Sequence, residues 1–67
     1  MRFTMQQCRK KKGLTQEQVA EQAGITRGSY AHIELGTRNP SVKVAARIAK
    51  ALSCSLDEVV KDDAATA

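Results

Sequence analysis

The stretch from residue 16 to residue 35, QEQVAEQAGITRGSYAHIEL, predicts two short helices joined by a tight turn. Thr15 precedes the first helix as an N-cap, and Gln18 follows three residues later, at the spacing of a capping box. Gly24 stands where a helix commonly ends in a left-handed residue, a conformation that glycine adopts at little steric cost. Thr26 then caps a second helix that runs to the end of the stretch. Because the turn is only about three residues long, the two helices must cross steeply.

The two predicted helices have an inner and an outer face. Apolar residues recur at helical spacing on the inner face, where they pack the helices together: Val19, Ala23, Ile25, Tyr30 and Ile33. The second helix keeps an outer face of short or hydrogen-bonding residues: Arg27, Gly28, Ala31 and His32, with Ser29 to one side. A helix with such a face fits the width of the DNA major groove.

The rest of the chain predicts three further helices and no strand of useful length. Residues 3–12 form the first, Ser41 caps another over about residues 42–52, and Ser55 caps a last short one over residues 56–60. The expected fold is therefore all-α, a compact bundle of five short helices in which the second and third are the steeply crossing pair.

The length of the chain limits the size of its core. The 67 residues suffice for one small domain, and such a domain buries only about 60% of its unfolded surface. With one Phe, one Tyr and no Trp, the core must be largely aliphatic. We expect the domain to cover residues 1–62, with residues 63–67 as a frayed polar tail. Dimerisation would add buried area to so small a core, and we expect it.

The charge and the missing motifs narrow the function. The chain has 11 Lys and Arg against 7 Asp and Glu, and its net charge of +4 favours a polyanionic partner, although many small proteins are basic. It has one histidine, no glycine-rich phosphate loop and no catalytic constellation, so we expect no enzyme, cofactor or metal site. No apolar run approaches the roughly 18 residues of a membrane span, no signal peptide is evident, and the two cysteines lack metal-ligand spacing. These features predict a reduced, cytoplasmic protein.

The run from residue 14 to residue 59, LTQEQVAEQAGITRGSYAHIELGTRNPSVKVAARIAKALSCSLDEV, resembles the helix-turn-helix domains of the phage repressor and Cro class. Its specific features are LTQEQVA, the turn at Gly24, the I-E-x-G ending at residues 33–36, and the helix that runs from NPS to KAL. The resemblance extends over roughly residues 4–60 and implies a lambda-repressor-like fold.

The resemblance implies a sequence-specific regulator of transcription that binds double-stranded DNA as a homodimer, with the second helix of the pair in the major groove. Its operator would be short and roughly palindromic, and its action repression or autoregulation. We expect no small-molecule effector, because so short a chain leaves no room for a ligand-sensing domain. Phage or plasmid repressors, controllers of restriction–modification systems and antitoxins all share such sequences. The alternative function is a module of the same fold, or an antitoxin, that binds a partner protein.

Base readout falls to the outer face of the second helix, with five candidates: Thr26, Arg27, Gly28, Ala31 and His32. Arg27 is the strongest, because a guanidinium can donate two hydrogen bonds to guanine O6 and N7. Thr26 and Ala31 can meet a thymine methyl group, and His32 is either a groove contact or a solvated surface histidine. Family members often carry a base-reading side chain at the position of Gly28. This departure bears on the target sequence and not on the mode of binding.

Phosphate contacts fall to polar and basic residues around the same helix: Gln16, Ser29, Thr37, Arg38 and Lys43. Gln16 stands at the N-terminus of its helix, where free N–H groups and the helix dipole favour an anion. The resembling family commonly places the glutamine at this position on a backbone phosphate. Lys43 lies in the first turn of its helix, where a cation opposes the dipole but suits a nearby phosphate.

Two further sets of residues take structural roles by resemblance. An ion pair between Arg9 and Glu34 would tie the first helix to the end of the base-reading helix, and the alternative for Arg9 is a direct phosphate contact. The dimer surface would lie around Cys54, Ser55 and Leu56, near the two-fold axis. Cys54 is then either a small apolar contact or one half of a disulfide across that axis under oxidation.

Overall fold

The computed structural model describes residues 1–60, which form five α-helices and no strand: α1 (Phe3–Lys11), α2 (Gln16–Ala23), α3 (Arg27–Leu35), α4 (Val42–Leu52) and α5 (Leu56–Val60). The predicted all-α bundle of five short helices is confirmed, and each helix ends within one residue of its predicted limit. The predicted domain end at residue 62 and the predicted tail, residues 63–67, lie outside the described residues.

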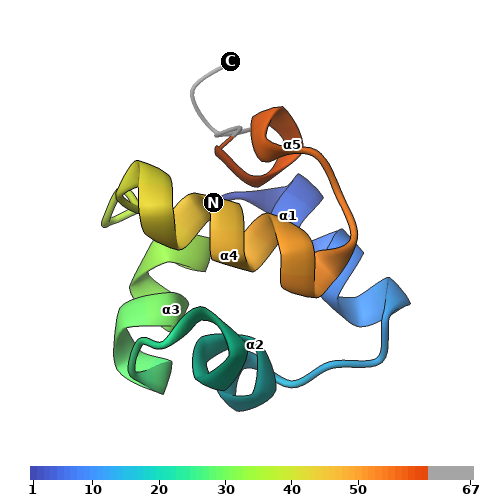
Figure 1. The fold of residues 1–67 in the computed structure, drawn as a ribbon, viewed down its shortest axis with the longest axis horizontal. Coiled ribbons are helices and arrows are strands. Elements are labelled where there is room, and N and C mark those ends of the chain that lie inside the picture. Colours follow the sequence, from blue (N-terminus) through green and yellow to red (C-terminus); the bar gives the residue numbers. More distant parts are fainter. Residues whose placement is uncertain (61–67) are drawn as a thin grey trace.

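The five helices are arranged around α4. Figure 1 shows α4 crossing the middle of the molecule, with α5 on one side and the α2–α3 pair on the other. α4 packs against α2 and α5, while α1 packs against α3, α4 and α5. None of the helices in the described part of the chain has the length and apolar character that a membrane span requires.

The core draws apolar side chains from all five helices. Each helix contributes one of the five largest fully buried side chains: Met5, Val19, Tyr30, Ile48 and Val59, in the order α1 to α5. Ala20 is also buried, and its small side chain suits a helix that packs against both α3 and α4. The core is thus aliphatic apart from Tyr30, whereas Phe3 is half exposed.

The crossing of α2 and α3 is fixed by local hydrogen bonds. The Thr15 hydroxyl accepts from the Gln18 main-chain N–H at 3.1 Å, and the Gln18 side chain accepts from the Thr15 N–H at 2.8 Å, so the capping box is complete. At the other end of α2, Gly24 has φ +73°, and the Ile25 N–H donates to the Ala20 carbonyl at 3.0 Å. The capping box fixes where α2 begins, and the left-handed Gly24 with the Ile25 bond sets the direction in which the chain leaves α2 for α3.

α4 ends at a residue that is poorly suited to its backbone conformation. Ser53 has φ 54°, and within residues 1–60 it is the one residue other than glycine with a positive φ. The left-handed conformation brings the Cβ atom of a non-glycine residue close to the following carbonyl oxygen. The Ser53 hydroxyl also accepts a hydrogen bond from the Lys12 ammonium at 3.1 Å, an exposed contact of small value.

We expect Ser53→Gly to raise the free energy of unfolding by roughly 1 kcal/mol, because glycine removes the left-handed strain. Ser53→Ala is the matched control, since it also loses the hydroxyl but keeps Cβ, and it should not gain stability. Urea denaturation of the three proteins measures both effects. Equal stabilisation by glycine and alanine would show that the strain at Ser53 is not the cause.

Candidate nucleic-acid interface

α3 divides its residues between the core and the solvent. Tyr30, Ile33 and Glu34 are buried, while Arg27 and His32 are exposed on the outer side. Gly28 and Thr26 are also exposed, and Ala31 is half buried. The structure therefore brings the five predicted base-contact candidates to one helix and its cap.

The guanidinium of Arg27 is available for an outside contact as far as residues 1–60 are concerned. Its side chain is exposed and makes no hydrogen bond or ion pair with any residue of the described chain. Gly28 next to it is equally unconstrained, because a Cβ built there would meet nothing within 4 Å and its φ is negative. Within residues 1–60, neither the Arg27 side chain nor the lack of a side chain at Gly28 is required by a contact of the fold.

His32 and Thr37 contact each other across the end of α3. The Nδ1 atom of His32 lies 3.0 Å from the Thr37 hydroxyl, and that hydroxyl also donates to the His32 main-chain carbonyl at 3.2 Å. The Nε2 atom of His32 has no partner in the described part of the chain. A base-contact candidate and a phosphate candidate thus form one unit with a free ring nitrogen.

Ser29 and Arg38, two phosphate candidates, also meet. The Arg38 Nη1 atom donates to the Ser29 hydroxyl oxygen at 3.2 Å, so the loop after α3 reaches back to its first turn. The Ser29 hydroxyl is bonded as well to Thr26, whose hydroxyl caps α3 by accepting from the Ser29 N–H at 3.1 Å. Lys43 is exposed in the first turn of α4 and is not bonded to this group within residues 1–60.

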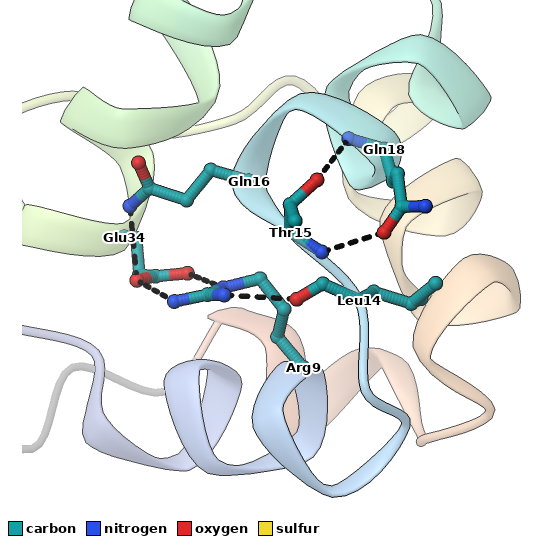
Figure 2. A network of polar contacts seen from close by, with 6 residues as sticks. All are labelled: Arg9, Leu14, Thr15, Gln16, Gln18 and Glu34. Carbon is teal, nitrogen blue, oxygen red and sulfur yellow. Dashed lines mark hydrogen bonds and ion pairs between the residues drawn. The ribbon is translucent and has the colours of Figure 1, made fainter.

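The side of α3 that faces the protein is held by an ion pair. The Arg9 Nε atom lies 2.8 Å from Glu34 Oε2, and Arg9 Nη2 donates to Glu34 Oε1 at 3.2 Å (Figure 2). The remaining nitrogen, Nη1, donates to the Leu14 carbonyl at 2.9 Å. Only 3% of the Glu34 side chain and 12% of the Arg9 side chain are exposed. Arg9 therefore has its donors committed inside the protein.

Gln16 belongs to the same network. Its amide nitrogen donates to Glu34 Oε1 at 3.2 Å, so the side chain turns toward α3 (Figure 2). The amide keeps a second N–H, and the first turn of α2 keeps main-chain N–H groups that no helical carbonyl can satisfy. An anion at this end of α2 could therefore accept from the main-chain N–H groups of the first turn and from the second N–H of the Gln16 amide.

The network controls the protonation of Glu34. Burial alone would raise the pKa of this carboxyl group, but the hydrogen bonds that it receives, first from Arg9, outweigh burial and lower its pKa below the ordinary value of 4.5. The Tyr30 hydroxyl nearby is buried without a hydrogen-bond partner in the described residues. Burial, followed by the charge of Glu34, raises the pKa of Tyr30, so the phenol stays protonated.

The two cysteines, 46 residues apart in sequence, lie against the same small pocket. Cys8 and Cys54 are both half buried and help to line a pocket of about 300 Å³ between α1 and the α4–α5 connection. Burial and the neighbouring Cys8 raise the pKa of Cys54 to about 12. A protonated thiol is a poor nucleophile, which disfavours rapid disulfide formation at neutral pH. Ser55 caps α5, where its hydroxyl accepts from the Glu58 N–H at 3.2 Å, and Leu56 is 43% exposed.

Arg2 is an internal residue that the sequence analysis did not single out. Only 2% of it is exposed, and its guanidinium donates to the carbonyls of Ile33 and Arg38 and to the side chain of Asn39. These partners lie 31 to 37 residues away, so helical periodicity gives no sign of them. The one sequence signal is an arginine directly before a helix, where a cation is unfavourable to the helix dipole.

We expect the stability that ionised Glu34 provides to be fully present above its unfolded-state pKa of about 4.5 and lost as pH falls through its lower folded-state pKa. The free energy of unfolding of Glu34→Gln should therefore change less between pH 6 and pH 3 than that of the wild type. At pH 7 the variant should lose about 3 kcal/mol, because the buried Arg9 charge is left without its partner.

Urea unfolding across this pH range measures the effect of Glu34→Gln. Glu17→Gln is the matched control for the loss of one carboxylate, since Glu17 is exposed and lies outside the Arg9–Glu34 network, and at pH 7 it should lose much less stability than Glu34→Gln. Parallel pH curves for wild type and Glu34→Gln would show that Glu34 does not carry the acid sensitivity.

Comparison with known proteins places this geometry in a family. A profile of the helix-turn-helix family matches residues 5–59. Similar proteins include the uncharacterized HTH-type transcriptional regulator YqaE of Bacillus subtilis, which is 42% identical over 59 residues, or 88% of this chain and 51% of that protein. An uncharacterized HTH-type transcriptional regulator of Methanothermobacter thermautotrophicus is 46% identical over 52 residues, or 78% of this chain and 75% of its own.

A third relative, the uncharacterized HTH-type transcriptional regulator YqaF of Bacillus subtilis, is 48% identical over 52 residues, which cover 78% of this chain and 68% of that protein. The chain spans about half the length of YqaE, so the match there is to one domain of a longer protein. No solved structure matches the chain at a comparable level of significance.

Proposed function

Because this chain belongs to the XRE-like helix-turn-helix family of DNA-binding transcriptional regulators, we propose that it binds a short, roughly palindromic operator as a homodimer, with α3 in the major groove. We further propose that it acts in the cytoplasm as a repressor or autoregulator. The observation that carries the proposal is the outer face of α3, where Arg27 is exposed and has no partner within residues 1–60.

The outer face supplies the groups for base readout. The free guanidinium of Arg27 can donate two parallel hydrogen bonds to guanine O6 and N7. The Nε2 atom of His32 offers one further polar contact a little more than one turn along the helix. Gly28 has no side chain and Ala31 has only a methyl group, so the helix backbone can approach the base edges closely.

The residues around α3 supply the phosphate contacts. Ser29 with Arg38, and Thr37 with His32, form two polar pairs at the edges of the outer face. A phosphate can replace or join these internal bonds, because hydroxyl and guanidinium groups have donors to spare. Together with Lys43 and the first turn of α2, they would fix the register in which the base-reading residues work.

One domain makes too few base contacts for useful specificity, and a two-fold dimer doubles their number. Two copies of α3 would read half-sites roughly 34–36 Å apart, one helical turn of DNA. Leu56 and Val60 lie four residues apart on α5 and are 43% and 45% exposed. This apolar edge, next to Cys54 and Ser55, supports a dimer surface at the α4–α5 end of the molecule.

We expect selection from a random duplex library at near-physiological salt to enrich an inverted repeat with half-site centres one helical turn apart. Affinity for the selected site should fall steeply with salt, because phosphate contacts release counterions. Both are measured by sequencing the bound duplexes and by titration at several salt concentrations. Weak, unselective binding would instead favour the protein-interaction or antitoxin function and direct the search to a partner protein.

We expect Arg27→Ala to relax the preference at one base position in each half-site, a loss of about 1–3 kcal/mol of discrimination. The matched control is Arg47→Ala, which removes the same charge from an exposed arginine on α4 beside the turn at Gly24. The control should keep the full preference. An unchanged base preference in Arg27→Ala, measured by the same selection, would mean that α3 presents a different face to the DNA.

A further inference from the structure

A charged side chain is buried where the base-reading helix ends. Arg2 is 2% exposed, and its Nη1 atom donates to the carbonyl of Ile33 and, at 3.2 Å, to that of Arg38. Its Nη2 atom donates to Asn39 Oδ1 at 2.6 Å, and its main-chain N–H donates to the Glu34 carbonyl at 2.8 Å. All four acceptors belong to the last turn of α3 or to the loop that follows it.

The contacts of Arg2 complete the C-terminal end of α3. The last carbonyls of a helix have no partner inside the helix, and they form the negative end of its dipole. Arg2 satisfies the carbonyls of Ile33 and Glu34, while that of His32 accepts from the Gly36 and Thr37 N–H groups. A guanidinium can donate in several directions at once, which a lysine ammonium on its flexible stem does less well.

The same contacts hold the loop after α3. Arg2 bonds the main chain of Arg38 and the side chain of Asn39, so two consecutive loop residues are tied to the helix end. From this fixed main chain, the Arg38 side chain reaches back to Ser29. Thr37 lies between Glu34 and Arg38, whose main-chain carbonyls both accept from Arg2. Two of the five phosphate candidates, Thr37 and Arg38, are therefore on a loop that a residue hidden from solvent holds in place.

We propose that Arg2 is a positioning residue for DNA binding. It clamps the loop to α3, so that Thr37 and Arg38 meet phosphates in the register in which Arg27 meets the bases. This inference rests on the proposed function. Arg2 differs from Arg9 in what it holds, because Arg9 bonds the Glu34 side chain from α1 and makes no hydrogen bond to the loop within residues 1–60.

The test replaces Arg2 by lysine, which keeps the charge but cannot reproduce the spread of hydrogen bonds. We expect Arg2→Lys to weaken binding to the selected operator roughly tenfold. The slope of log affinity against log salt concentration should fall in magnitude by about one for each phosphate that the variant no longer binds. The base preference should be unchanged. Arg47→Lys, the same exchange at an exposed arginine, is the matched control and should bind as the wild type does.

A double-mutant cycle separates positioning from general destabilisation. Thermal unfolding first identifies a temperature at which every variant is folded, and affinities are measured there. If Arg2 acts through the loop, adding Arg2→Lys to Arg38→Ala should cost much less than it does in the wild type, whereas its cost should be unchanged on top of Arg27→Ala. Wild-type affinity in Arg2→Lys, or full additivity with Arg38→Ala, would overturn the proposal while leaving the proposed function intact. Failure of the wild-type protein to bind DNA would overturn both.

Discussion

The buried ion pair between Arg9 and Glu34 is the constraint on which the arrangement of the helices depends. Two charges can leave water without a large penalty only if they are paired and their remaining hydrogen-bonding atoms are satisfied. Here that requirement recruits α1 through Arg9, the α1–α2 connection through the Leu14 carbonyl, α2 through Gln16, and α3 through Glu34. Apolar packing has no directional preference, whereas the hydrogen bonds of this network are directional and oppose rotation of α3. The outer face of α3 is thus set from the inside.

The chain uses part of its basic character for internal structure. Arg2 and Arg9 both hold the end of α3, one by its main-chain carbonyls and the other by the Glu34 carboxylate. Two of the 11 Lys and Arg residues are therefore not available for a direct phosphate contact, and the charge of one of them, Arg9, is balanced by Glu34. Under the proposed function, this division favours binding, because α3 is already fixed before exposed cations such as Arg27 and Lys43 contact DNA.

The sequence predicted those features that depend on neighbouring residues. The cap at Thr15, the glycine at the turn and the outward face with Arg27 each follow from spacings of a few residues, and the helices match their predicted limits. Contacts between distant residues were not predictable from local patterns, and the Arg9–Glu34 pair was expected only from the family resemblance. The burial of Arg2 and the proximity of Cys8 to Cys54 join opposite parts of the chain, and no local pattern marks them. The direction of the Gln16 side chain likewise depends on a distant residue, Glu34 on α3, to which its amide donates.

Gly28 is a residue of α3 whose identity is not explained by the needs of folding. Glycine inside a helix costs about 1 kcal/mol relative to alanine. At this position the backbone does not need it, and a Cβ would touch nothing in the described chain. Nothing within residues 1–60 accounts for the glycine. Under the proposed function, it would let DNA come close to the helix backbone beside Arg27. Tyr30, Ile33 and Glu34 on the inward face are buried, and Arg2 bonds the last carbonyls of the helix. Because these contacts do not involve the outward face, the proposed function predicts that substitutions there change the target sequence without changing the fold.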